Sequence, residues 1–111
     1  MGSTMNKTET TNCGITKALE TIGSKWTMLI LRDLMTGPKR FSELEHSLVG
    51  ISTRTLAQRL EELAMDDIVV RDCSSGPAHP LYRLTSQGAS LQDILDQLRR
   101  WGDALRLEQA A

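Results

Sequence analysis

A polar group of side chains between residues 52 and 59 is suited to the recognition of nucleic acid. It combines hydroxyls, one amide and two guanidiniums: Ser52, Thr53, Arg54, Thr55, Gln58 and Arg59. An arginine can donate two hydrogen bonds to guanine O6 and N7, and a glutamine can pair with adenine N6 and N7. Hydroxyls at the start of a helix can hold a phosphate. We therefore take this stretch as a candidate for contact with DNA base edges and phosphates.

The same stretch reads as the front of a helix with two unlike faces. Ser52 is the predicted N-cap, because a serine hydroxyl can accept from the free backbone N–H groups of a first turn. Apolar side chains recur at helical spacing behind the polar group, at Leu56, Leu60, Leu63 and Ala64. An ordinary solvated face would have a similar composition. The surrounding elements must decide between the two interpretations.

A second helix is predicted just before the polar stretch. Ser42 and Glu45 have the Ser-x-x-Glu spacing of a capping box, so a helix should run from Ser42 to about Val49. Gly50 then supplies a tight turn, which makes a helix-turn-helix pattern. Corners of this kind also occur in helical proteins that bind no DNA. If the pattern does bind DNA, Lys39, Arg40 and Ser42 are expected to contact phosphates.

A β-hairpin is predicted after the helix-turn-helix. Residues 68–71 are rich in β-branched side chains, residues 72–80 are rich in turn formers, and residues 81–84 can pair back. Such a hairpin is the wing of a winged helix, and its tip can follow phosphates or enter a minor groove. The candidate contacts are Arg71, Ser74, Ser75, His79 and Arg83. Simple solvent exposure of these side chains is the alternative.

The rest of the chain predicts helices on both sides of this motif. Residues 15–22 form a short helix ended by Gly23, and residues 25–35 form a buried central helix. Thr85 is expected to cap one long terminal helix with a single apolar stripe, consisting of Leu91, Ile94, Leu95, Leu98, Trp101 and Leu105. That stripe exceeds the needs of a small core, so we expect it to form a homodimer interface; packing within one chain is the alternative.

The composition limits the classes of protein that remain. At 111 residues we expect a flexible arm at residues 1–12 and one domain at residues 13–111. Aromatic residues make up only 4% and the net charge is -1, so the fold should be mainly α and any basic surface must be local. No apolar run approaches the roughly 20 residues that span a bilayer, so we expect a soluble, cytoplasmic protein without membrane contact.

Many short blocks of the chain, in one order from Cys13 to about Asp103, resemble the HxlR-type family of winged-helix transcriptional regulators, which are relatives of the MarR group. The blocks include Lys25-Trp26-Thr27, Leu29-Ile30-Leu31-Arg32-Asp33-Leu34, Arg40-Phe41-Ser42-Glu43-Leu44, Gly50-Ile51-Ser52, Gln58-Arg59-Leu60, Tyr82-x-Leu84-Thr85 and Trp101-Gly102. The resemblance implies a mainly α winged helix-turn-helix with a small β-hairpin and a long C-terminal dimerisation helix. It also implies a homodimer that regulates transcription from a pseudo-palindromic operator in double-stranded DNA.

The chain departs from the family in two places. Thr53 stands where many members have proline after the N-cap serine, and a threonine there preserves the helix. The wing sequence at residues 72–80 differs from the usual stretch that contains tyrosine and proline. The wing contacts are therefore not supported by the resemblance.

Cys13 is the candidate sensor residue. It matches the N-terminal cysteine with which a subgroup of the family senses oxidants or electrophiles. A thiol just before a helix start lies near the positive end of the helix dipole, and Lys17 adds positive charge, which both favour the reactive thiolate. A small buried apolar side chain or an unused thiol is the alternative. A small-molecule or oxidant effector follows only from the first interpretation.

No cofactor is expected, and no metal site, because His46 and His79 have no second ligand at metal spacing and the two cysteines form no CxxC cluster. A thiol enzyme built around Cys13 is a rival hypothesis, but the sequence has no base or oxyanion site at a recognisable spacing, so we do not expect an enzyme. A winged helix used only to bind other proteins is a third hypothesis, to which the net charge of -1 lends support.

Overall fold

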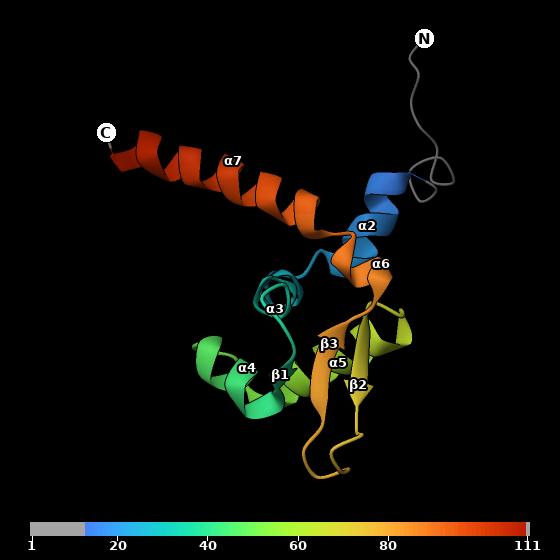
Figure 1. Cartoon of the computed structure of the whole chain (residues 1–111). Helices are drawn as coiled ribbons and strands as arrows, with labels where there is room; N and C mark the ends of the chain where they lie inside the picture. Colours follow the sequence, from blue (N-terminus) through green and yellow to red (C-terminus); the bar gives the residue numbers. More distant parts are fainter. Residues whose placement is uncertain (1–12, 111) are drawn as a thin grey trace.

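The computed structural model describes residues 13–110, so the predicted arm at residues 1–12 lies outside the described residues. In chain order the elements are α2 (Gly14–Ile22), α3 (Lys25–Leu34), β1 (Lys39–Arg40), α4 (Phe41–Ser47), α5 (Thr53–Met65), β2 (Val69–Asp72), β3 (Leu81–Leu84), α6 (Ser86–Ala89) and α7 (Gln92–Ala110). Figure 1 shows the hairpin of β2 and β3 beside α5, and α7 projecting from the body. This order confirms the predicted winged helix-turn-helix with a long C-terminal helix.

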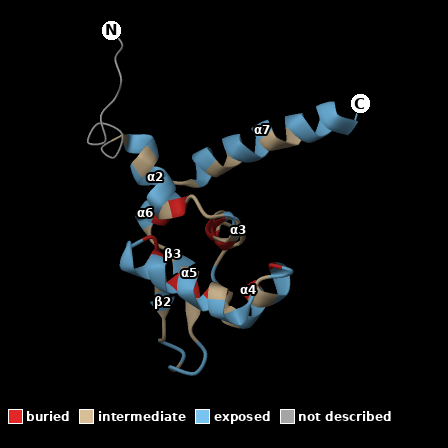
Figure 2. Cartoon of the chain, turned by 180° about the vertical axis from the view of Figure 1, so that it is seen from behind, coloured by how far each residue is buried: buried red, intermediate tan, exposed pale blue. Residues whose placement is uncertain are grey.

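The core lies where α3, α4, α5 and the hairpin meet. Its fully buried side chains are aliphatic: Ile30, Leu31, Leu44, Leu56, Leu60 and Leu63. Figure 2 shows these buried residues gathered on α3, α4 and α5, whereas α7 is largely exposed. Burial of each such side chain contributes about 1.5–3 kcal/mol. The packing of α5 against α3 and the hairpin therefore determines which face of α5 is turned outward.

The sheet has one more strand than the sequence predicted. β2 and β3 pair antiparallel, with Arg71 opposite Tyr82, and β1 pairs antiparallel with the other edge of β3, with Lys39 opposite Tyr82. The strand order is β1-β3-β2. β1 has only two residues, which is too short for any alternation of apolar and polar side chains to be recognised. Its pairing attaches the start of α4 to the hairpin.

The capping box predicted for α4 is wrong by two residues. α4 begins at Phe41 with Arg40 as its N-cap, and the Glu43 side chain accepts from the Arg40 backbone N–H at 2.8 Å. Ser42 is therefore inside the first turn. Glu45 caps nothing in its own helix; its carboxylate points to α5 instead, accepting from the Thr53 hydroxyl at 2.6 Å. The Arg40–Glu43 pair, and not Ser42–Glu45, therefore marks the start of α4.

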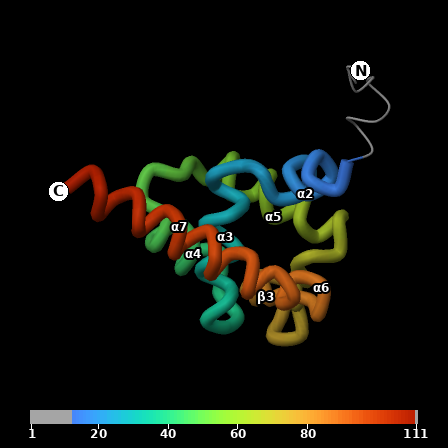
Figure 3. Tube along the Cα trace, turned by 90° about the horizontal axis from the view of Figure 1, so that it is seen from above, coloured from blue at the N-terminus to red at the C-terminus, as the bar shows by residue number. Residues whose placement is uncertain are grey.

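The single terminal helix expected after Thr85 is also wrong, because the structure divides it into α6 and α7. Thr85 caps α6, accepting from the Gly88 backbone N–H at 3.0 Å while donating to the Asp67 carbonyl at 2.7 Å. The Leu91 N–H then bonds to the Gly88 carbonyl in a tighter turn. Figure 3 shows α7 leaving α6 in a new direction.

The apolar stripes are also narrower than predicted. Ile22 is buried, but Ile15 and Leu19 of α2 are 70% and 58% exposed. Ala64 of α5 is likewise exposed, although Leu56, Leu60 and Leu63 are buried as expected. Ile15 and Leu19 are therefore not part of the core.

Gly88 allows α6 to pack closely on the end of α5. A β-carbon at this position would collide with the backbone carbonyl of Ile68. We expect Gly88→Ala to lower the free energy of unfolding by about 1–3 kcal/mol, because backbone atoms have to move to make room. Chemical denaturation at a fixed protein concentration measures this. Gly14→Ala, whose β-carbon would meet nothing within 4 Å, is the control, and equal stability of the two variants would contradict the prediction.

Candidate nucleic-acid interface

The outward face of α5 carries Arg54 and Gln58. Both are exposed, and they lie one helical turn apart on the side opposite the buried Leu56, Leu60 and Leu63. Arg54 makes no ion pair with any of residues 13–110, so its guanidinium is available to a partner. Two side chains of the predicted set therefore have the orientation that base recognition requires.

The hydroxyl groups at the start of α5 are hydrogen-bonded within the protein. The Ser52 Oγ accepts from the Thr55 backbone N–H at 3.0 Å, which confirms Ser52 as the N-cap, and it also donates to the Thr55 Oγ1 at 2.9 Å. The Thr53 hydroxyl donates to Glu45. These bonds stabilise the helix start. They also commit the hydroxyl protons of Ser52 and Thr53, which were predicted to be available to DNA.

Arg59 differs from Arg54 in its surroundings. Its side chain is only 28% exposed and its Nη1 is paired with Glu62 at 3.0 Å. The Nε is buried without a hydrogen-bond partner among the described residues. At 100° per residue, Arg59 lies on the flank of α5 rather than on the face of Arg54 and Gln58. The structure thus does not bring Arg59 together with the other two side chains.

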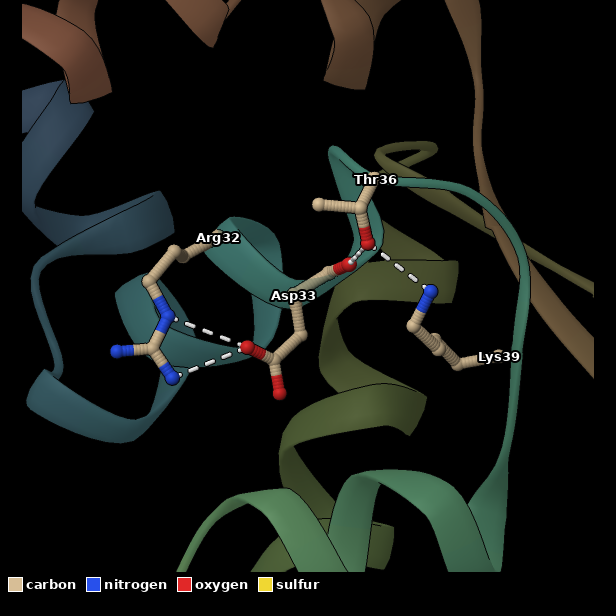
Figure 4. A network of polar contacts seen from close by, with 4 residues as sticks. All are labelled: Arg32, Asp33, Thr36 and Lys39. Carbon is tan, nitrogen blue, oxygen red and sulfur yellow. Dashed lines mark hydrogen bonds and ion pairs between the residues drawn. The ribbon is translucent and has the colours of Figure 1, made fainter.

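Lys39 and Arg40, predicted to contact phosphates, are anchored next to the start of α4. The Lys39 Nζ donates to the Thr36 hydroxyl at 3.0 Å, and Figure 4 shows this bond joining the network that ends in the Arg32–Asp33 ion pair. The Arg40 Nη1 donates to the carbonyl of His79 in the wing. That link, between residues far apart in sequence, could not be inferred from the sequence. It fixes the wing relative to α4.

The wing side chains make contacts mainly with one another. Arg83 is paired with Asp72 at 3.6 Å, and the Arg71 Nη1 donates to the Cys73 Sγ at 3.1 Å. Hydrogen bonds from the side chain and backbone of Ser74 lower the pKa of Asp72, with help from Arg83. Hydrogen bonding with the Tyr82 side chain, and the nearby Cys73, raise the pKa of Arg71 above its usual value. Both charges are therefore stabilised at neutral pH.

Ser75 and His79 are exposed in the loop between β2 and β3, which fits both a DNA contact and simple solvent exposure. The back half of α5 has the opposite charge, with Glu61, Glu62, Asp66 and Asp67 all exposed. An approaching phosphate backbone is repelled there. On the helix-turn-helix and the hairpin, the basic side chains lie at the front of α5, at the start of α4 and in the wing.

Cys13 is the N-cap residue of α2 and is partly exposed, and its side chain makes no capping hydrogen bond. Cys73, in the wing, is also a free thiol of intermediate exposure.

Among residues 13–110 no cluster of three or more His, Cys, Asp or Glu side chains has the arrangement of a metal site. None of the described helices is long and apolar enough to cross a membrane.

The six residues predicted for the dimer interface fall into two groups. Leu91 and Leu95 pack against the core of their own chain. Ile94, Leu98 and Trp101 are 52%, 46% and 68% exposed, and Leu105 is 37% exposed. The four lie on one side of α7 at helical spacing. This apolar face has no partner in the described part of the chain.

A recess of about 690 Å³ lies between α3 and α7. Met28, Leu29 and Met35 line it from α3, and Leu95 and Arg99 line it from α7. The structure places them at the boundary between the DNA-binding elements and α7.

Comparison with known proteins agrees with this architecture. A model of the family described as HxlR-like helix-turn-helix matches residues 21–110. The chain is 38% identical to the HTH-type transcriptional regulator YodB of Bacillus subtilis over 87 residues, which cover 78% of each protein. Its structure is similar to that of quinone-bound YodB from B. subtilis, with a TM-score of 0.70 and 36% identity over 81% of this chain and 96% of that one. It is also similar to the redox regulator HypR in its reduced form, with a TM-score of 0.80 and 30% identity over 89% of this chain and 100% of that one.

Proposed function

The chain belongs to the HxlR-like helix-turn-helix family of DNA-binding transcriptional regulators, which are not enzymes, and from that premise we propose that it binds a specific operator as a homodimer. The observation that carries the proposal is the exposure of Arg54 and Gln58 on α5, opposite a fully buried leucine stripe. In a helix-turn-helix the second helix enters the major groove. Arg54 then donates to guanine and Gln58 pairs with adenine.

Contacts to phosphate set the register of α5 in the groove. Lys39, Arg40 and Ser42 lie at or just before the first turn of α4, and the Arg40–His79 bond joins them to the wing. Arg71 and Arg83 extend this positive surface along the hairpin, although Arg83 is already paired with the carboxylate of Asp72. Contacts of this kind fix orientation without reading sequence. The net charge of -1 is compatible with DNA binding because a local group of basic residues, rather than the charge of the whole chain, meets the phosphates.

The homodimer follows from the uncovered face of α7. Ile94, Leu98, Trp101 and Leu105 expose apolar surface of the kind that marks an interface with another protein. Ile15 and Leu19 of α2 are exposed apolar side chains as well. A two-fold pair can place two copies of α5 about 34 Å apart, the repeat of one turn of DNA. The operator is therefore a pseudo-palindrome with half-sites on one face of the duplex.

A response to oxidants or electrophiles is the second part of the proposal. Cys13 is a partly exposed free thiol at the N-terminus of α2, and the solved relatives include a quinone-bound regulator and a redox regulator. In the simplest reaction the Cys13 sulfur adds to a ring carbon of a quinone, the C=C π bond of the ring breaks, and a carbonyl oxygen gains the proton that the thiol loses; transfer of the ring C–H proton to the other oxygen then gives the hydroquinone thioether. The adduct enlarges the side chain at the start of α2, and we expect this change to alter operator affinity.

Replacement of Arg54 tests whether the outward face of α5 recognises bases. We expect Arg54→Ala to weaken binding to the selected operator by about 1–3 kcal/mol and to relax the preference at one base pair of each half-site. Arg100→Ala removes the same charge from an exposed position on α7 and is the control. Fluorescence anisotropy at several salt concentrations gives both affinities. Wild-type binding that is insensitive to salt would contradict DNA binding itself, since counterion release must weaken it.

Replacement of Trp101 tests the dimer. A glutamate within a buried apolar interface is costly, so Trp101→Glu should shift the protein to monomers in sedimentation experiments. Leu107→Glu is a matched control, because Leu107 is 72% exposed on the opposite side of the same helix and should not affect assembly. If the wild type is monomeric, or if both variants dissociate equally, the proposed interface is wrong.

Replacement of Cys13 tests the sensor. Treatment with p-benzoquinone should change operator affinity of the wild type and of Cys73→Ser, while Cys13→Ser should bind DNA normally and no longer respond. Mass spectrometry of the intact protein locates the adduct. An unchanged response in Cys13→Ser would assign sensing to another residue and refute this part of the proposal.

A further inference from the structure

Glu45 of α4 reaches across to the first turn of α5. Its Oε2 accepts a hydrogen bond of 2.6 Å from the Thr53 hydroxyl. Glu43 occupies the capping position of α4, so the carboxylate of Glu45 is not needed there. The bond places a carboxylate at the N-terminus of the helix that carries Arg54. Such a group is unexpected at a surface that approaches phosphates.

The direction of this bond limits what the pair can bind. A threonine hydroxyl has one proton, and here Glu45 accepts it; a carboxylate only accepts. The second oxygen of Glu45 has no hydrogen-bond partner among residues 13–110. The pair therefore presents only acceptor positions, namely the lone pairs of Thr53 and the free Glu45 oxygen. It attracts N–H donors and repels phosphate oxygens.

In the major groove the donors are the amino groups of two bases. Cytosine presents N4 and adenine presents N6, whereas guanine O6 and thymine O4 are acceptors. The other hydroxyls at this end of α5, those of Ser52 and Thr55, are bonded to each other. Arg54, the next residue after Thr53, presents only donors. Acceptor and donor groups are thus adjacent at the tip of α5.

We propose that Glu45, held by Thr53, is a specificity-determining residue that selects an amino base, cytosine or adenine, at one position of each half-site. The inference rests on the proposed function, since it requires α5 to enter the major groove. It assigns Thr53 to base selection rather than to the phosphate contact that its hydroxyl suggested. It also assigns a readout role to α4, the helix otherwise expected only to contact the backbone.

The test is selection of bound sequences from a random DNA pool by the full-length wild type and by Glu45→Gln. The wild type should enrich cytosine or adenine at one position of each half-site. In Glu45→Gln the enrichment there should fall about fivefold or more, because an amide also donates and no longer excludes keto bases. Preferences at the other positions should remain, and affinity for random DNA should rise, because a negative charge facing phosphates is removed.

Three further variants separate base selection from a purely structural link between the helices. Thr53→Val should lose the same preference, Thr53→Ser should retain it, and Glu108→Gln, which removes an exposed charge from α7, should change nothing. Thermal unfolding of each variant reports on the fold, and Thr53→Val decides the matter if Glu45→Gln is unstable. Unchanged preferences in Glu45→Gln or Thr53→Val, or an equal loss at all positions, would overturn the inference. A wild type that selects no common sequence would refute the proposed function instead.

Discussion

The burial of one leucine stripe on α5 is the interaction on which the rest of the structure depends. Leu56, Leu60 and Leu63 are at most 2% exposed and pack in the centre of the core. Because a helix advances 100° per residue, their burial fixes the direction of every other side chain on α5. Arg54 and Gln58 consequently face outward, and Arg59 is turned to the flank, where it pairs with Glu62. The same packing that stabilises the fold selects the reading face.

Local signals in the sequence were sufficient for the elements whose residues are close together. Ser52 caps α5, Gly50 makes the turn, and the β-branched stretch pairs with residues 81–84 as predicted. Apart from the local Arg40–Glu43 cap of α4, the failures involve partners on different elements. β1 forms because its two residues pair with the free edge of β3. The Glu45–Thr53 and Arg40–His79 bonds depend on how the helices and the wing pack against one another. A capping motif at Ser42 and Glu45 was plausible locally, but Glu43 caps α4 through the Arg40 N–H, and Glu45 bonds to Thr53 of α5 instead.

Because the chain breaks between α6 and α7, α6 stays packed on the body while α7 presents an apolar face outward. α6 is held to the end of α5 by Thr85 and by the close approach of Gly88 to Ile68. α7 keeps Leu91 and Leu95 near the core and turns Ile94, Leu98, Trp101 and Leu105 outward. The recess between α3 and α7 lies where α7 meets the helical core. A change in the angle of α7 would therefore alter the separation of the two reading helices in a dimer.

The most direct measurement is a crystal structure of the full-length protein on a duplex taken from its selected sequences. We expect two copies of α5 in successive major grooves, with Arg54 and Gln58 within hydrogen-bond distance of base edges. Arg59 should remain paired with Glu62, and Glu61 and Asp66 should lie away from the phosphates. A complex in which another surface meets the DNA, or in which Arg54 and Gln58 face solvent, would contradict the assignment of α5 as the reading helix.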